Sequence, residues 1–339
     1  MECNSVLVAD RVRDFKGADV TSRHLEHADD DYFADVYNAL SAVSARVTHY
    51  ESPRQFIDNA AKHANDVVLT IWSGERSRNR RALVPATCEA CGIAYVGADP
   101  YFQLISADKQ IAKAYARRFG IESARGVQVD CEEDIGKIKM LEAPLVVKPN
   151  FEGGSIGIFR QSYATTHKSA KRVCNQLLAH YPSLLVEEYI EGDEVDICMV
   201  GNANGVQVLQ ACLFDHDDDR KLYGAEEKKI AQGVGRSIVD RSLIPEQVWQ
   251  SAQSLFEQSG KVEVMRLDGM LKNGSFTMVE LSPDCSLRKT GGIARACAAS
   301  GISYEEMFDL LLSNAIRDRQ TADQNASMTG KARRNLPEP

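Results

Sequence analysis

Apolar and polar positions over the first hundred residues follow the pattern of strands separated by helices. Four short apolar runs, at 5–10, 45–50, 66–72 and 93–98, predict β-strands. Helical segments are predicted between them, for example at 53–64 and 81–92. Strands that alternate with helices favour a parallel sheet covered on both faces. We therefore expect the chain to begin with an α/β unit.

The pattern then changes to that of an α+β segment. A helix is predicted from Ser106 to Phe119, with Ser106 as its N-cap and Gly120 as its stop. A second helix is predicted near 165–180, and it precedes a strand at 183–190.

Two antiparallel hairpins are predicted in the second half of the chain. Apolar runs meet at the turn Asn202–Gly205 and again at Asn273–Gly274, and such turns are typical of hairpins. Helices are predicted at 245–259 and from Tyr304 to about Arg317. The remaining residues lack apolar periodicity, so the tail at 319–339 is expected to be disordered.

The overall composition is that of an ordinary globular protein. Of 339 residues, 44% are hydrophobic and 26% charged, and the net charge of −8 argues against general nucleic-acid binding. No apolar run approaches the roughly 18 residues of a membrane span, and no signal peptide pattern is present. Nine scattered cysteines suit a reducing compartment, and we expect a cytoplasmic protein.

Cys88 and Cys91 form the only C-x-x-C spacing. A redox or metal role is one interpretation, but no second Cys/His pair has zinc-finger spacing. The favoured interpretation is that both cysteines pack as small side chains on a helix.

The stretch VVKPNFEGGSIGIF, residues 146–159, contains the first candidate chemistry. Lys148 ends an apolar strand, so its ammonium group can point into a cleft. Gly153 and Gly154 allow the backbone to approach a phosphate closely, and Ser155 adds a hydroxyl group. An ordinary turn has the same composition, so the stretch alone leaves both interpretations open.

Two carboxylates in the second hairpin form the next candidate site. A three-residue turn at 273–275 places Asp268 directly opposite Glu280, whereas a two-residue turn puts them on opposite faces. Facing carboxylates repel, and a cation between them would relieve the repulsion. Carboxylate and phosphate oxygens are the ligands that Mg²⁺ prefers. The alternative is two acids on a solvated face with no metal.

These pieces, in this order, resemble the ATP-grasp enzymes and, within that superfamily, the D-alanine–D-alanine ligases. The resemblance spans about residues 100–315 and covers the first hundred residues more loosely. It rests on SADKQIAKAYARRFGI (106–121), PLVVKPNFEGGSIGI (144–158), LLVEEYIEGDEVDICMVGN (184–202), MRLDGMLKNGSFTMVELSP (265–283) and GISYEEMFDLLL (301–312).

The resemblance implies an ATP-grasp fold of mixed α/β and α+β class. An N-terminal parallel α/β domain at 1–103 would be followed by two α+β subdomains that clamp ATP. The central subdomain, with the phosphate lid, would span 104–186. The C-terminal subdomain, with the metal site, would span 187–318.

The resemblance also implies roles for individual residues. Lys109 and Lys148 would bind ATP phosphates, Glu194 would bind the ribose hydroxyls, Lys228 would reach the γ-phosphate, and Arg266 would stabilise the reaction's oxyanion. The lid over the phosphates would be Glu152, Gly153, Gly154 and Ser155, and the adenine hinge Glu187, Glu188, Tyr189 and Ile190. Asp268 and Glu280, with Ser282 as a third ligand in place of the family's asparagine, would hold Mg²⁺ or Mn²⁺.

The chain departs from the ligases at the positions that touch the amino-acid substrates. Ser282 stands where the family pattern has an asparagine, Gly154 where it has a serine, and Lys229 where it has a tyrosine. The acceptor segment SPDCSLRKTGG (282–292) is shorter and different, and SGERSRNRRALVP (73–85) lacks the usual histidine just upstream.

Several basic residues offer a site for an anionic substrate. Four arginines, Arg76, Arg78, Arg80 and Arg81, precede a predicted helix, where cations oppose the helix dipole unless an anion binds there. Arg288 and Lys289 in the acceptor segment offer a second site. A solvated basic face is the alternative for both.

The leading hypothesis is an ATP-dependent carboxylate–amine ligase that acts through an acyl phosphate on substrates other than two D-alanines. ATP and Mg²⁺ would be its cofactors, and small-molecule carboxylates and amines its partners. No nucleic acid or membrane partner is expected, and a homodimer is possible by resemblance. The alternatives are a nucleotide-binding protein with altered catalysis and an ATP-grasp phosphotransferase.

Overall fold

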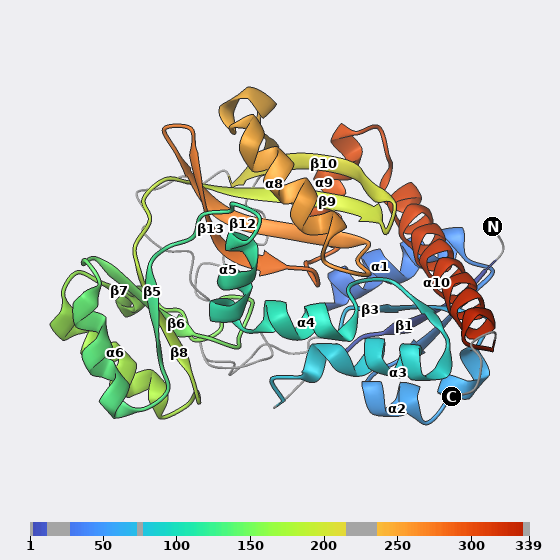
Figure 1. Ribbon diagram of the computed structural model, residues 1–339, viewed down its shortest axis with the longest axis horizontal. Helices are drawn as coiled ribbons and strands as arrows, with labels where there is room; N and C mark the ends of the chain where they lie inside the picture. The colour runs from blue at the N-terminus through green and yellow to red at the C-terminus, as the bar shows by residue number, and fades with distance from the viewer. Residues whose placement is uncertain (1–2, 12–27, 73–76, 215–235, 335–339) are drawn as a thin grey trace.

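Three β-sheets organise the part of the chain that the structure describes (Figure 1). The computed structural model describes residues 3–11, 28–72, 77–214 and 236–334. One sheet is parallel and the other two are antiparallel, so the expected mixed α/β and α+β class is confirmed. No helix among the described residues is long and apolar enough to cross a membrane.

The N-terminal sheet has the order β2-β1-β3-β4, and all its neighbouring strands are parallel. Its strands are β1 (Asn4–Val8), β2 (Arg46–Tyr50), β3 (Val67–Thr70) and β4 (Ala94–Tyr95). The sheet is covered on both faces, as predicted. Leu7 packs in one core with Leu40 of α1 (Asp30–Val43), while Val6 packs in another with Phe56 and Cys88. Each such buried side chain contributes about 2 kcal/mol.

Two helical segments cover the second face of this sheet. The predicted helix at 53–64 is divided into α2 (Pro53–Ile57) and a 3₁₀ turn, η2 (Ala60–His63). The predicted helix at 81–92 begins with a 3₁₀ turn, η3 (Arg80–Ala82), and continues as α3 (Leu83–Cys91). On α3, Cys88 is buried and Cys91 is exposed, and both thiols are free.

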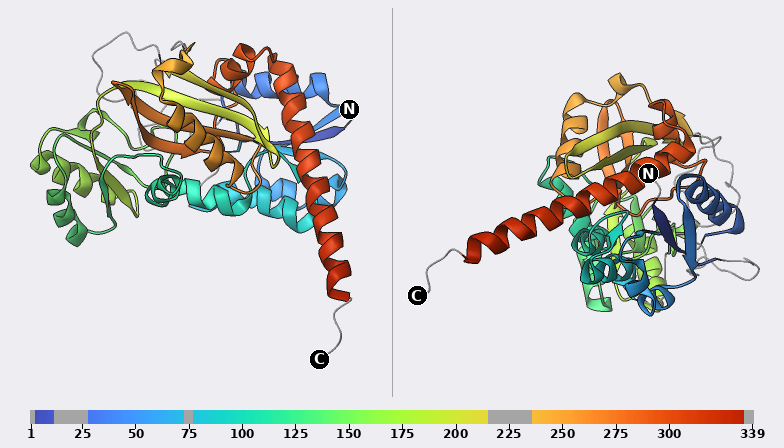
Figure 2. Two further views of the ribbon diagram at one scale, coloured as in Figure 1. Left: turned by 45° about the horizontal axis from the view of Figure 1, so that its top comes forward. Right: turned by 90° about the vertical axis from the view of Figure 1, so that its right-hand side faces the viewer.

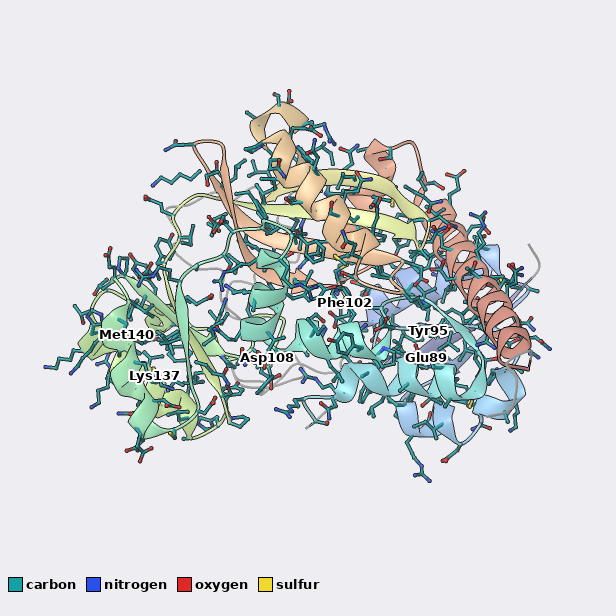
Figure 3. All side chains as sticks on the ribbon, in the orientation of Figure 1. Glu89, Tyr95, Phe102, Asp108, Lys137 and Met140 are labelled. Atoms are coloured by element: carbon teal, nitrogen blue, oxygen red, sulfur yellow. The ribbon has the colours of Figure 1, made fainter. Side chains whose placement is uncertain are left out.

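A four-stranded antiparallel sheet follows, with the order β5-β8-β6-β7. It contains β5 (Gly126–Val129), β6 (Leu145–Pro149), β7 (Tyr163–Ala164) and β8 (Leu184–Glu188), and it packs against α6 (His167–Leu178) and a 3₁₀ segment, η4 (Glu132–Met140). Figure 3 labels Lys137 and Met140 of η4 at the outer end of this unit. Since β8 spans 184–188, the subdomain boundary expected at 186/187 falls inside a strand.

The third sheet is five-stranded and antiparallel, with the order β11-β10-β9-β12-β13. Its strands are β9 (Asp193–Asn202), β10 (Gly205–Phe214), β11 (Arg236–Ile238), β12 (Val264–Lys272) and β13 (Ser275–Ser282). Both predicted hairpins are confirmed, because β9 pairs with β10 and β12 with β13.

The two faces of this sheet belong to different hydrophobic cores. On one face, Ile197 and Met265 pack with Trp249 of α8 (Glu246–Glu257). On the other face, Cys198 and Val264 share a core with α9 (Gly292–Ala299), α10 (Tyr304–Arg334) and the N-terminal sheet. The central sheet and the N-terminal unit are thus joined through a common core.

The C-terminal helix is longer than predicted. α10 continues through 319–334, where a disordered tail was expected, and Figure 2 shows its last turns extending beyond the rest of the molecule. No proline interrupts the sequence there before Pro337, and the three alanines and four basic residues in 319–334 favour a helix without apolar periodicity. Residues 335–339 lie outside the described part of the chain.

The predicted helix at 106–119 is two helices, α4 (Pro100–Ala107) and α5 (Lys109–Arg117), which meet at Asp108 (Figure 3). Ser106 is therefore not an N-cap. Asp99 caps α4, and Asp108 caps α5 by accepting from the backbone N–H groups of Gln110 and Ile111, each at 3.1 Å. The cap places Lys109 in the first turn of α5.

Candidate active site

The hairpin β12–β13 brings Asp268 directly opposite Glu280. The turn is the two-residue alternative, because it holds only Asn273 and Gly274, whose φ angles of 50° and 74° lie in the left-handed region. The expectation that such a turn puts the two acids on opposite faces is therefore wrong. The facing arrangement arises from a β-bulge. Gly269 pairs with Met278 and Asp268 with Glu280, so Val279 is the extra residue on its strand.

The carboxylate row extends to a third strand. β9 lies beside β12, and its Asp196 is directly opposite Asp268. The side chain of Asp196 is buried with 0% exposure. Asp196 was not predicted as a site residue, although an acid inside the apolar run VDICMV was a usable signal.

Cations lie against each carboxylate of the row. The Nζ atom of Lys109 is 3.1 Å from Glu280 Oε1. Arg266 donates to both oxygens of Asp268, from Nε at 2.5 Å and from Nη2 at 2.7 Å. The Nε atoms of Arg266 and Arg236 lie 3.7 Å and 3.5 Å from the oxygens of Asp196.

This environment shifts the pKa values of Asp196 and Arg266. Burial raises the pKa of Asp196 well above its usual value. Burial works against the charge of Arg266, but Asp196 and Asp268 together hold the pKa of this guanidinium above its usual value. Ser282 lies opposite Arg266 at the end of β13, where the sequence analysis expected it.

A second charged cluster lies one helical turn further along α5. Lys148, at the end of β6, pairs with Glu187 of β8 at 2.7 Å, and Lys113 of α5 pairs with the other oxygen of Glu187. All three side chains are buried. Lys113 was missed in the sequence, although it lies one helical turn after Lys109. The first two turns of α5 therefore connect the carboxylate row to the Lys148 strand.

The pKa values of Lys113 and Glu187 follow from burial and charge. Burial and the nearby Lys148 lower the pKa of Lys113 to about 8. Burial alone would raise the pKa of Glu187, but Lys148 and Lys113 hold it below its usual value. The cluster contains one more positive than negative group, and additional negative charge there is favoured.

The glycine loop after β6 is a series of tight turns. Gly154, Ser155 and Gly157 have φ angles of 60°, 61° and 70°. A Cβ atom on Gly157 would lie 2.5 Å from Cγ of Pro149, so only glycine fits there. The loop is held at Glu152, whose backbone oxygen accepts from Lys109 Nζ and whose carboxylate pairs with Arg80 Nη2 at 3.1 Å. Gly153 lies between Glu152, which is held by these contacts, and Gly154, where the turns begin.

The segment expected to be the adenine hinge follows β8. The backbone N–H groups of Glu188 and Tyr189 donate to Arg125 O and Pro144 O, each at 2.9 Å, and Ile190 comes next. Glu194 lies on β9 opposite Met270, two residues before Asp196.

The arginine-rich segment of the N-terminal unit reaches both sides of the site. Arg80 is 2% exposed and pairs with Glu152, Arg78 lies over the Phe151 ring, and Arg81 pairs with Asp284 of the acceptor segment. Arg76, Lys228 and Lys229 lie outside the described residues.

Arg288 also has a partner within the protein. It donates to Asp29 from both terminal nitrogens, at 3.0 Å and 2.7 Å, and its guanidinium lies 4.8 Å from the centre of the Tyr32 ring. Lys289 lies over the Tyr304 ring at 5.7 Å. The acceptor segment is thus fixed against α1.

The sequence model described as the D-ala D-ala ligase C-terminus matches residues 118–313, which is more than half of the chain. The chain belongs to this family of ATP-grasp carbon–nitrogen ligases. A D-alanine–D-alanine ligase of Thermotoga petrophila is 24% identical to it over 284 residues, which are 83% of this chain and 90% of the relative. A D-alanine–D-alanine ligase A of Bacillus cereus is 24% identical over 258 residues, covering 76% and 83%.

Solved structures of the family share its fold. The D-alanine–D-alanine ligase of Bacillus anthracis complexed with ATP aligns with a TM-score of 0.71 and 17% identity, over 95% of this chain and 100% of that one. The enzyme of Coxiella burnetii aligns with a TM-score of 0.69 and 15% identity, over 98% and 99%. These likenesses confirm the ATP-grasp fold.

The donor groups of this ligase suit a hard divalent cation. Asp268 and Glu280 present carboxylates at facing positions, and Mg²⁺ is commonly held by one or two carboxylates together with substrate phosphates. Within the described residues, no group of three or more His, Cys, Asp or Glu side chains is arranged to hold a metal. Arg266 and Lys109 provide the positive charge beside the two carboxylates.

Proposed function

We propose that this ligase joins a carboxylate to an amine through an acyl phosphate, with release of ADP and phosphate, on substrates other than two D-alanines. The observation that carries the proposal is the Asp268–Glu280 pair, with Arg266 and Lys109 beside it and the Lys148 cluster one helical turn away along α5. Phosphoryl transfer depends on this combination of positioned cations and metal-binding carboxylates.

The ATP site is proposed on the same geometry. Lys109 and Lys148 would bind phosphate oxygens, and the loop of Glu152, Gly153, Gly154 and Ser155 would cover them with backbone N–H groups. The hinge from Glu187 to Ile190 would receive the adenine, and Glu194 the ribose. Lys228, outside the described residues, keeps its proposed role at the γ-phosphate.

The reaction follows from these positions. Asp268 and Glu280 would hold Mg²⁺, which neutralises charge on the transferring phosphoryl group. An oxygen of the substrate carboxylate forms a bond to the γ-phosphorus as the bond to ADP breaks. The amine then attacks the acyl carbon, loses a proton, and displaces phosphate. Arg266 would donate hydrogen bonds to the oxyanion of that second step.

The substrate proposal rests on the acceptor side. Gly154 and Ser282 differ from the family pattern, and the segment at 282–292 is shorter. Two ion pairs anchor this segment to the N-terminal unit. Asp284 of the segment pairs with Arg81, and Arg288 of the segment pairs with Asp29. Arg78 and Lys289 remain candidates for binding an anionic substrate group. We also propose three functional subdomains, 1–103, 104–188 and 189–318, with the second boundary moved from 186/187 to the end of β8.

The test is ADP formation from ATP and Mg²⁺, screened over pairs of amino acids and small acids, with mass spectrometry of the products. We expect an amide product from a pair other than two D-alanines. Asp268→Ala should lower turnover about a hundredfold or more. Glu246→Gln, at an exposed surface pair, is the matched control and should behave as the wild type.

Three outcomes would contradict the proposal. A phosphorylated product without an amide would indicate a phosphotransferase. ATP binding without turnover would indicate a nucleotide-binding protein. If Asp268→Ala left ADP formation unchanged, the active site would not be at Asp268.

A further inference from the structure

Asp196 is a buried carboxyl group without the hydrogen bonds that such a group needs. Asp196 and Glu263 are both 0% exposed. Glu263 accepts hydrogen bonds from the backbone of Gly97 and from Lys261. Neither oxygen of Asp196 accepts a hydrogen bond from any residue within 3–11, 28–72, 77–214 or 236–334. Burying a carboxylate without hydrogen bonds is costly, so its presence requires an explanation.

The cations nearest to Asp196 are close enough to attract it but too far to donate to it. Arg236 Nε lies at 3.5 Å and Arg266 Nε at 3.7 Å. Arg266 gives its hydrogen bonds to Asp268, at 2.5 Å and 2.7 Å. Asp196 and Asp268 are directly opposite each other on neighbouring strands. The guanidinium of Arg266 therefore lies between two carboxylates, and a shift of about 1 Å would bring its Nε into hydrogen-bond range of Asp196.

The bond between Arg266 and Asp268 conflicts with the proposed role of Asp268. Both oxygens of Asp268 accept from Arg266, while a divalent cation needs lone pairs of the same oxygens. The guanidinium must then give up at least one of these hydrogen bonds. Its side chain is only 17% exposed, so water offers little replacement.

The surroundings of Asp196 favour movement of Arg266 and not of Asp196. A Cβ atom on Gly292, at the start of α9, would lie 3.3 Å from Asp196 Oδ2 and 3.0 Å from Cys198 Sγ. The carboxylate is therefore packed tightly beneath α9. The guanidinium is at the end of a longer and more flexible side chain.

We propose that Asp196 is a positioning residue for Arg266. When Asp268 binds a divalent cation, the guanidinium of Arg266 turns from Asp268 to the carboxylate of Asp196. The inference rests on the proposed function of Asp268. Arg266 then keeps a buried counter-charge in both states, and its remaining N–H groups stay directed into the site. Without Asp196, Arg266 remains on Asp268 and competes with the cation.

The experiment measures Mn²⁺ binding to the protein saturated with ADP, by the electron paramagnetic resonance signal of free Mn²⁺. We expect Asp268→Asn to weaken binding strongly and Asp196→Asn to raise the Kd about tenfold, with ADP affinity in the absence of metal unchanged. Asp318→Asn is the matched control and should bind Mn²⁺ as the wild type, because Asp318 is another buried acid but accepts from the backbone N–H of Ala203, just beyond the end of β9 at Asn202.

A double-mutant cycle separates the proposed role from simple loss of charge. In the Arg266→Gln background, Asp196→Asn should change the Kd less than twofold, because no guanidinium is left to compete. An equal weakening in both backgrounds would show that Asp196 acts only through its charge and would overturn the proposal. So would an unchanged Kd in Asp196→Asn, or Mn²⁺ binding that does not depend on Asp268.

A measurement on the wild type guards against variants that do not fold. The Nε–H resonance of Arg266, assigned by its loss in Arg266→Gln, should shift when Mg²⁺ is added to the ADP complex, and the absence of a shift would overturn the proposal. None of these readouts needs turnover. A protein that binds Mn²⁺ as expected but forms no ADP would contradict the proposed function and leave this inference standing.

Discussion

Glu263 shows how a single buried carboxyl group joins two parts of the molecule. It accepts from the backbone N–H of Gly97 at 2.6 Å and pairs with Lys261 at 2.7 Å. Lys261 also donates to the backbone oxygen of Gly97 and lies 3.9 Å from the centre of the Tyr95 ring, labelled in Figure 3. Burial raises the pKa of Glu263 to about 7, although Lys261 opposes the shift.

This raised pKa predicts a pH-dependent stability. Between pH 4.5 and 7 the carboxyl group is ionised in the unfolded chain but protonated in the folded protein, so stability falls as the pH rises. From pH 4.5 to 7, the free energy of unfolding of the wild type should fall relative to Glu263→Gln by about 3 kcal/mol. Urea denaturation at several pH values measures the difference.

The control for this prediction is Glu257→Gln, which removes an exposed acid on α8. It should keep the pH dependence of the wild type. If Glu263→Gln also kept it, the carboxyl group would not hold its proton in the folded state.

At the scale of elements, the break between α4 and α5 controls the position of a proposed phosphate ligand. Asp108 accepts from the N–H groups of Gln110 and Ile111 and also from Asn150 Nδ2 at 3.0 Å. One side chain thus fixes the start of α5 and the end of the Lys148 strand. Lys109 is the first residue after this cap.

Asp108→Ala should lower the free energy of unfolding by about 1–2 kcal/mol, because the helix cap is lost. It should also raise the Kd for ATP several-fold, since Lys109 loses its fixed position. Asp108→Asn retains an accepting oxygen and is the matched control. Denaturation and ATP titration measure both effects, and equal ATP affinities in the two variants would contradict the second.

The same junction shows which elements sequence patterns could and could not predict. The strands, both hairpins and the stop at Gly120, whose φ is 77°, follow from apolar alternation and turn residues. The cap at Asp108 was missed because the apolar pattern continues through it and Ser106 offered an equally suitable side chain. The bulge at Val279 was missed because a bulge and a longer turn give the same pairing of Asp268 with Glu280.

At the scale of the whole molecule, the N-terminal unit holds the glycine loop. Arg80 and Glu152 are 72 positions apart, and their side chains are 2% and 3% exposed at the ion pair. Spacing in the sequence cannot predict a pairing over that distance. From the sequence, the arginines offered either a site for an anionic ligand or a solvated basic face, whereas the structure shows protein partners for Arg80, Arg81 and Arg288.

Arg80→Gln should destabilise the protein by about 3 kcal/mol, because it leaves a buried carboxylate without its guanidinium partner. Backbone amides of residues 153–158 should exchange hydrogen faster, since the loop loses its anchor. Arg54→Gln breaks an exposed pair with Asp58 and should change stability by less than about 0.5 kcal/mol. Unchanged exchange in Arg80→Gln would show that the loop is held elsewhere.

The bulge at Val279 has a consequence for the division of β13 between two environments. Phe276, Met278 and Glu280 are separated by two residues each, so a regular strand would direct all three to one face. Phe276 and Met278 instead pack in the hydrophobic core with Leu281, while Glu280 faces Asp268. Val279 shifts the phase of the alternation by half a period. Without the bulge, a hairpin of this length could either bury Phe276 and Met278 in the core or place Glu280 opposite Asp268, but not both.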